Sequence, residues 1–215
     1  MLARLLAGGR VSLLIGILSM AITVGAGVLI GALSGYAGGK VDALLMRATE
    51  LVMVFPTFFL IILVVASFGG SVPLLILVIG LTSWPVAARI VRGEVLKIRA
   101  REYVLAARSV GATQARILVR HVLPALAAVV IVSATIRVGT NILIEAGLSY
   151  LGLGVQPPLA SWGNMVADGA RVIRTEWWLT AIPAMAIFGT VLVFNLLGES
   201  LRDLSDPRLA LGRRR

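Results

Sequence analysis

The chain has 215 residues, of which 59% are hydrophobic and only 14% are charged. This charged fraction is well below that of a soluble domain, about 25%. We therefore expect a multi-span helical membrane protein. The net charge of +10 does not indicate a nucleic-acid partner, because basic residues that flank membrane spans account for it. Cysteine is absent and His121 is the only histidine, which excludes disulfides, thiolate metal sites and a multi-histidine metal site within the chain.

Several apolar stretches are long enough to cross a membrane as helices, which takes roughly 20 residues each. The predicted spans are 11–33, 45–68, 72–90, 123–144 and 177–197. The second and third are separated at Gly69-Gly70-Ser71-Val72-Pro73, a turn-forming sequence inside a charge-free run that is too long for one span. We therefore predict one all-α transmembrane domain, 1–215, built as a polytopic helical bundle.

The first stretch is interpreted as an uncleaved span, because its apolar run exceeds the core of about 7–15 residues found in signal peptides. Pro56, Pro85 and Pro183 lie within predicted spans; we expect them to kink these helices, either as hinges of a gate or for packing. Another group of small residues is expected to permit close helix packing, namely Gly25, Gly27, Gly31, Gly139 and Gly189.

The hydrophilic interruption at 91–122 is strongly basic and is expected on the cytoplasmic side. Alternating spans then place further basic residues inside: Lys40, Arg47, Arg202, Arg208, Arg213, Arg214 and Arg215. Only Arg4, Arg10, Arg171 and Arg174 fall outside, where Trp177 and Trp178 fit an outer aromatic belt. One feature conflicts with this arrangement, since the two arginines nearest the amino terminus would by themselves hold that end inside.

Within the basic interruption, REYVLAAR is rich in helix-forming residues. Gly111 permits a turn that a residue with a β-carbon would resist, and Thr113 can cap a second helix. Pro124 falls just inside the next apolar run, where a proline costs a helix little. We predict two short helices with a glycine bend at the inner membrane surface, which either dock onto a protein partner or bind anionic lipid.

The same stretch resembles the EAA loop of permease subunits of bacterial ABC importers: Glu-Ala-Ala, three residues, Gly, nine residues, Ile, one residue, Leu-Pro. Leu105-Ala106-Ala107, Gly111 and Leu123-Pro124 occupy this spacing, with Leu105 in place of the acid and His121 in place of the isoleucine. Other phrases are similar to the C-type permeases of the dipeptide, oligopeptide and nickel branch: GYAGGKVDALLMR, ARIVRGEVL, REYVLAARSVGA, RHVLP, SYLGLGVQPP, SWGNM, FNLLGESLRD and DPRL.

The resemblance implies a permease in a bacterial or archaeal plasma membrane, with a cytoplasmic carboxyl terminus. Its implied partners are a homologous second permease, two cytoplasmic ATPase subunits that bind ATP and Mg²⁺, and an extracytoplasmic substrate-binding protein. Peptides are the implied cargo, with nickel or another small solute as the alternative. Relatives typically have six spans, and RLLAGGRVSLLIG is similar to the approach to their second one. This chain is therefore expected to begin after their first span, and a true five-span variant is the alternative.

The resemblance also implies which residues couple to the ATPases: Arg101, Glu102, Leu105, Ala106, Ala107, Arg108, Gly111, Ala112, Arg116, Leu123 and Pro124. Glu102 or Glu94 is a candidate to replace the acid missing at Leu105. The chain itself has no P-loop, since its only Gly-Lys pair, Gly39-Lys40, is followed by Val41. We therefore expect no catalytic residue and no bound cofactor in this chain.

Ser133, Arg137, Asn141 and Glu145 are spaced four apart and form one slanting polar stripe on the fourth predicted span. An unpaired arginine inside the hydrocarbon costs several kcal/mol, so Arg137 must face protein or water. Two interpretations stay open. The stripe lines the translocation path and Arg137 meets carboxylate or carbonyl groups of cargo, or Arg137 forms a structural pair with Glu145, Glu50 or a partner subunit.

The predicted outer loop, 145–176, contains Gln156, Pro157, Trp162 and Asn164. It is expected to cover the path or to receive the substrate-binding protein, and the plainer alternative is a connecting loop. An intramembrane hydrolase is disfavoured because His121 has no suitable nucleophile beside it. A stand-alone secondary transporter would show an internal repeat, and no convincing one is present.

Overall fold

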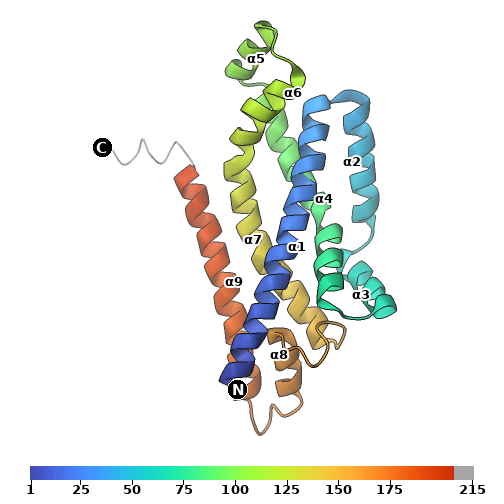
Figure 1. The fold of residues 1–215 in the computed structure, drawn as a ribbon, viewed down its shortest axis with the longest axis vertical. Coiled ribbons are helices and arrows are strands. Elements are labelled where there is room, and N and C mark those ends of the chain that lie inside the picture. Colours follow the sequence, from blue (N-terminus) through green and yellow to red (C-terminus); the bar gives the residue numbers. More distant parts are fainter. Residues whose placement is uncertain (206–215) are drawn as a thin grey trace, which may run out of the picture.

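The computed structural model describes residues 1–205, where all regular structure is helical (Figure 1). The elements are α1 (Leu2–Ala37), α2 (Gly39–Val54), α3 (Thr57–Phe68), α4 (Val72–Arg99), α5 (Glu102–Ser109), α6 (Gln114–Ile117), the π-helical turn η1 (Leu118–Val122), α7 (Leu123–Tyr150), α8 (Trp162–Ala170) and α9 (Trp178–Ser205). The arginines expected at 208 and 213–215, and the DPRL phrase, lie outside the described residues.

Four helical segments are long and apolar enough to cross a membrane, and α2 with α3 provides a fifth if this bent pair is one span. The predicted all-α bundle with five apolar spans is thus confirmed at the upper count. The helices are longer than the predicted spans, because hydrogen-bonded turns continue into charged residues at the ends. Thus α4 continues to Arg99, and α7 continues past Glu145 to Tyr150, so the predicted loops 91–122 and 145–176 begin as helix.

The second predicted span, 45–68, is not one straight helix. Its two parts, α2 and α3, meet at an angle of 72°. Phe55 is extended (φ −85°, ψ 127°) and is followed by Pro56, as expected for a residue before proline, which avoids the helical region. Pro85 and Pro183 instead lie within the continuous helices α4 and α9. Of the three predicted kinks, the one at Pro56 is a complete break.

Helix α1 packs along α4 (Figure 1) through glycines spaced four apart. A β-carbon at Gly27 would lie 2.5 Å from the β-carbon of Ala87, and one at Gly31 would collide with the carbonyl oxygen of Ala88. Gly139 approaches Val191 of α9 in the same way, with 3.3 Å to the nearest atom. The packing role predicted for these three glycines is confirmed, whereas Gly25 and Gly189 face open space within the described part of the chain.

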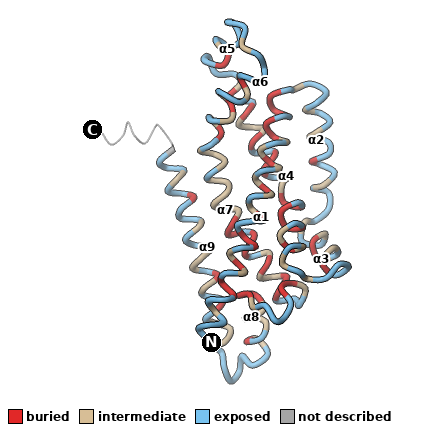
Figure 2. Tube along the Cα trace, viewed as in Figure 1, coloured by how far each residue is buried: buried red, intermediate tan, exposed pale blue. Residues whose placement is uncertain are grey.

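Burial is concentrated where α1, α4 and α7 face one another, and the outer surfaces of α2 and α9 are largely exposed (Figure 2). The short helices α5, α6 and α8 lie at the two ends of the long helices. Helices α5 and α6 project at one end, whereas α8 and the beginning of α1 lie at the other (Figure 1). The α5–α6 end and the α8 end are therefore separated by the full length of the long helices.

Candidate functional site

The α5–α6 end has the two short helices and the glycine bend that the sequence predicts. Helix α5 ends at Ser109, Gly111 has φ +80°, and α6 begins at Gln114. The hydroxyl of Thr113 accepts a hydrogen bond from the N–H of Arg116 at 3.4 Å, which caps α6 as expected. These local features follow from the residue types, because positive φ favours glycine and a threonine oxygen satisfies a free N–H.

The loop is attached to the bundle through an apolar cluster. Val104 of α5 and Ile117 of α6 are fully buried, and they pack with Ile98 of α4, Leu126 of α7 and Tyr36 of α1. Ala107 and Ala112 are partly buried against the same cluster. Because this cluster joins the loop to three long helices, displacement of the loop must displace the ends of those helices or break the cluster.

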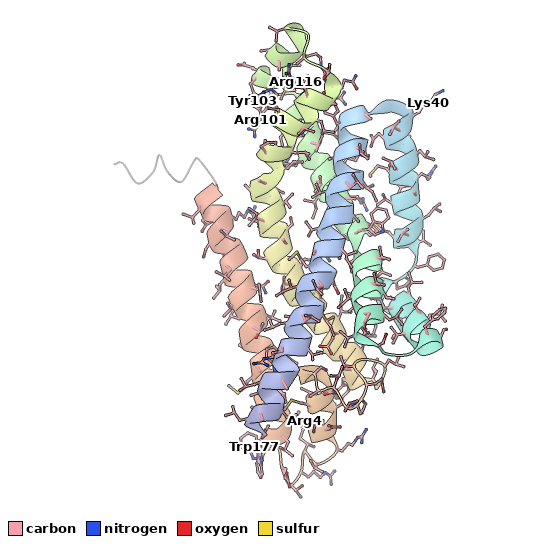
Figure 3. All side chains as sticks on the ribbon, viewed as in Figure 1. Arg4, Lys40, Arg101, Tyr103, Arg116 and Trp177 are labelled. Atoms are coloured by element: carbon pink, nitrogen blue, oxygen red, sulfur yellow. The ribbon has the colours of Figure 1, made fainter. Side chains whose placement is uncertain are left out.

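The other face of the loop is free of the bundle. Leu105 is 48% exposed and Val110 is 85% exposed. Most of the predicted coupling residues share this exposure, namely Arg101, Glu102, Ala106, Arg108, Gly111 and Arg116. Figure 3 shows Arg101, Tyr103 and Arg116 at this end, which also holds Lys40, whereas Arg4 and Trp177 lie at the opposite end. Of the two acids considered as replacements at the Leu105 position, Glu102 is exposed on α5, while Glu94 pairs with Lys97 at 3.1 Å.

The loop leads into α7 without an interruption of the helix, and Leu123 and Pro124 form the junction. Pro124 lacks an N–H, and its ring conflicts with the carbonyl four residues earlier in a regular α-helix. The backbone widens here into η1, where the N–H of Leu123 donates to the carbonyl of Leu118. The resulting rod from Gln114 to Tyr150 is one continuous connection from the loop to the α8 end.

A polar cluster that sequence reasoning missed joins the α1–α2 turn to α4. Arg92 donates two hydrogen bonds to Asp42, each 2.6 Å long, and Ser34 donates to the same carboxylate. Arg99 donates to the carbonyl oxygens of Gly35 and Tyr36 at 3.2 and 3.0 Å. Asp42 and Arg92 are 50 positions apart, so no local pattern connects them. The one hint in the sequence is that Asp42 is an acidic residue that follows a glycine turn.

The polar stripe on α7 divides into parts with different surroundings. Glu145 is fully buried and Asn141 donates weakly to the carbonyl of Gly16 at 3.5 Å, while Ser133 and Arg137 are partly buried. Two of the three structural pairs considered for Arg137 are wrong, because both acids bind elsewhere. Glu50 pairs with Arg47 at 3.3 Å, and Glu145 accepts hydrogen bonds from serines.

Glu145 is the centre of a buried network at the α8 end that also went unpredicted. Ser12 of α1 donates to one of its oxygens at 2.9 Å, and Ser149 donates to the other at 2.7 Å. Ser12 in turn accepts from the N–H of Trp162, and Ser149 accepts from the hydroxyl of Ser161. Each hydroxyl has one proton to donate and donates it once, so the network fixes α1, α7 and the start of α8 together.

The predicted outer loop contains α8 and is joined to α1 as well as to itself by hydrogen bonds. Trp162 is buried and donates from Nε1 to the carbonyl of Leu5 at 3.0 Å. Asn164 forms a capping box with Ser161 and also lines the pocket described next. Gln156 and Pro157 are exposed and line a pocket of about 440 Å³. Arg4 and Asp168, which pair at 2.5 Å, also line it.

A further pocket of about 260 Å³ lies where α2 and α3 meet, against α4 and α7, and Arg137 is part of its wall. No cluster of three histidine, aspartate or glutamate side chains that could hold a metal occurs among residues 1–205. The two pockets and the exposed face of the α5–α6 loop are the candidate binding surfaces described above.

Similar proteins were found by sequence and by structure. The oligopeptide transport system permease protein OppC of Haemophilus influenzae is 42% identical over 208 residues, covering 97% of this chain and 67% of the relative. OppC of Escherichia coli is also 42% identical, over 97% of this chain and 69% of its own length. OppC of Bacillus subtilis is 39% identical over 94% of this chain.

Among solved structures, a chain of the MetNI methionine ABC transporter in an inward-facing conformation superposes with a TM-score of 0.80. The match covers 96% of this chain and 98% of that one at 16% identity, so it shows a shared fold. The family model for the inner membrane component of binding-protein-dependent transport systems matches residues 27–211. With most of its length matched by this model and by relatives at about two-fifths identity, the chain is a member of that family of inner membrane transport components.

Proposed function

We propose that this chain is one of two membrane subunits of an ATP-driven importer of oligopeptides. Relatives named as oligopeptide permeases, at 42% identity over nearly the whole chain, are the observation that carries the cargo assignment. A homologous second permease completes the path, two cytoplasmic ATPase subunits bind ATP and Mg²⁺, and an extracytoplasmic binding protein delivers the peptide. The protein lies in a bacterial or archaeal plasma membrane, with the α5–α6 end and the carboxyl terminus in the cytoplasm.

Coupling occurs at the α5–α6 loop. The exposed Leu105 and Val110 supply apolar contacts, while Arg101, Arg108 and Arg116 supply charge for an ATPase surface. The leucine stands where the family's loop has an acid, so this contact is apolar rather than ionic. Movement of the docked loop passes through the buried Val104 and Ile117 to α4 and α7, which shifts the membrane path between inward- and outward-open states.

The path runs along the face formed by the α2–α3 bend, α4 and α7. Arg137 lines the pocket on this face, and Ser133, one turn earlier on α7, is the other member of the predicted stripe that is only partly buried. Glu145 and Asn141, being fully buried, hold the bundle together instead of contacting cargo. At the α8 end, Gln156 and Pro157 belong to the surface that receives the binding protein, because they are exposed beside the pocket lined by Arg4 and Asp168.

The test is ATP-dependent uptake in proteoliposomes that contain this chain, its companion permease, the ATPases and the binding protein. We expect accumulation of a labelled oligopeptide that requires ATP on the ATPase side and the binding protein on the other. Uptake that persists when the ATPases are omitted would contradict the proposal and indicate a secondary transporter. Uptake of nickel in preference to peptide would retain the ATP-driven mechanism and overturn the cargo.

A further inference from the structure

The pocket of about 260 Å³ at the α2–α3 bend has a mostly apolar wall that also contains an arginine and three hydroxyl side chains. Its lining includes Thr57 of α3, Thr82, Ser83 and Pro85 of α4, and Arg137 and Ile144 of α7. Arg137 is 13 residues beyond Pro124 in the same continuous helix, which places it about 20 Å along the helix axis. The pocket therefore lies deep within the membrane.

Arg137 has no counterion in the described part of the chain. Glu50 is paired with Arg47, and Glu145 is held by Ser12 and Ser149. No hydrogen bond from the guanidinium of Arg137 is present among residues 1–205. A partly buried cation that lacks a partner is costly in a membrane, so an anion that entered this pocket would remove an existing penalty.

Two further residues of the wall offer donors to an anion. Thr57 lines the pocket as the first residue of α3, a helix of 12 residues with no side-chain cap, so its N–H is not used within the helix. The Thr82 hydroxyl donates its proton to the carbonyl of Val78 at 2.7 Å and is therefore not a donor to the pocket. Ser83 is buried and lines the pocket, and its hydroxyl has no hydrogen-bond partner within residues 1–205. The side chain of Ser83 is thus free to donate.

We propose that this pocket is a carboxylate site on the translocation path, where the guanidinium of Arg137 binds the terminal carboxylate of a peptide in transit. The identity of the cargo rests on the proposed function, but the anion preference rests on the pocket alone. Guanidinium and carboxylate form paired hydrogen bonds of matching geometry. The volume is below that of a site for a drug-sized ligand, about 300–1,000 Å³, so the pocket holds one end of a peptide rather than the whole.

The absence of cysteine from the chain permits a direct test in the assembled transporter. Ser83→Cys places one thiol in the pocket, and its rates of modification by anionic and cationic methanethiosulfonates of similar size are compared. We expect the anionic reagent to react about tenfold faster relative to the cationic one when Arg137 is present. The preference should disappear in Ser83→Cys with Arg137→Gln and persist with Arg137→Lys.

Thr175→Cys, on the exposed turn after α8, is the matched control, and its rate ratio should not respond to the change at Arg137. Equal reagent ratios with arginine and glutamine at 137, or no reaction of the Ser83→Cys thiol with either reagent, would overturn the site. An ion pair between Arg137 and the second permease would give that equal ratio, so it counts against the proposal.

Protection by peptide identifies the group that is bound. Trialanine should slow modification of the Ser83→Cys thiol during turnover, trialanine amide should not, and Arg137→Gln should remove the difference. Equal protection by both peptides would overturn the carboxylate assignment. ATP-dependent uptake without an anion preference at Ser83→Cys would refute the pocket and leave the proposed function intact. An anion preference at Ser83→Cys without ATP-dependent uptake would support the pocket and refute the proposed function.

Discussion

Arg92 and Asp42 form a bidentate pair, in which Nε and a terminal nitrogen of the guanidinium each donate a hydrogen bond of 2.6 Å to the carboxylate. The contact fastens the first turn of α2 to α4 at the end of the molecule that holds the α5–α6 loop. The Asp42 side chain is 17% exposed and that of Arg92 is 33% exposed, so solvent screens this pair less than an ordinary surface pair. Its geometry is the paired arrangement in which such contacts are strongest.

Replacing Asp42 by Asn should lower the free energy of unfolding by about 1–2 kcal/mol, because a pair of opposite charges with two hydrogen bonds becomes one hydrogen bond from the charged guanidinium to a neutral amide oxygen. A double-mutant cycle with Arg92→Gln, followed by thermal unfolding in detergent, measures the coupling. Arg47 and Glu50 provide the control: they are 3.3 Å apart with side chains 78% and 58% exposed, so their coupling should be at most about 0.5 kcal/mol. Equal coupling in both cycles would show that the Asp42 contact is an ordinary surface pair.

Gly31→Ala should destabilise the bundle by about 1–3 kcal/mol, the usual cost of forcing an added group into a packed interface. The new methyl group would meet the carbonyl of Ala88 and the β-carbon of Val91, and α1 would have to move away from α4. Gly25→Ala in the same helix is the matched control, since nothing lies within 4 Å of its β-carbon position. Thermal unfolding that ranks the two variants equally would contradict the packing role of Gly31.

Sequence and structure agree best where structure is local. The bend at Gly111, the Thr113 cap and the two short helices depend on residues within a few positions of one another, and apolar length alone locates the long helices. The 72° break between α2 and α3 could not be predicted from the sequence, because each of three prolines within the spans predicts a kink equally well. Only Pro56 follows an extended residue in a largely exposed pair of helices, whereas Pro85 lies in α4, which α1 supports along its length.

The polar contacts were beyond prediction because they join distant positions. Glu145 and Ser12 are 133 residues apart, and their meeting depends on how α1 and α7 cross. Helical spacing correctly placed Glu145 and Arg137 on one slanting stripe of α7. It could not show that one would be enclosed by serines while the other would line a pocket, since that depends on which neighbouring helices each residue faces.

Ser149→Ala should lower the free energy of unfolding by about 1–3 kcal/mol, the cost of leaving buried polar groups without partners. The change removes the 2.7 Å donor to Glu145 and the acceptor of the Val155 N–H. Ser67→Ala is the control, because the Ser67 hydroxyl is exposed and bonds only to the carbonyl of Leu63 in its own helix. Proteolysis of the loop before α8, compared in the two variants, should show faster cleavage in Ser149→Ala alone.

Gly111→Ala should separate coupling from folding. Gly111 and Gly152 have almost the same positive φ, 80° and 79°, and neither has an atom within 4 Å of its β-carbon position. Alanine at either site should therefore cost about 1–2 kcal/mol of stability through backbone strain alone. The two sites differ in position, since Gly111 joins α5 to α6 and Gly152 lies at the α8 end.

If the α5–α6 loop transmits force from the ATPases, Gly111→Ala lowers the amount of peptide transported per ATP hydrolysed. Gly152→Ala, with matched unfolding temperature, keeps that ratio near the value of the unmodified chain even if it slows uptake, because Gly152 lines the pocket at the α8 end. The ratio of peptide transported to ATP hydrolysed is the decisive measurement, because strain that only lowers the amount of folded protein leaves this ratio unchanged. A fall in the ratio for Gly111→Ala alone places coupling in the loop. An equal ratio in both variants would mean that the ATPases act on the permease through another surface.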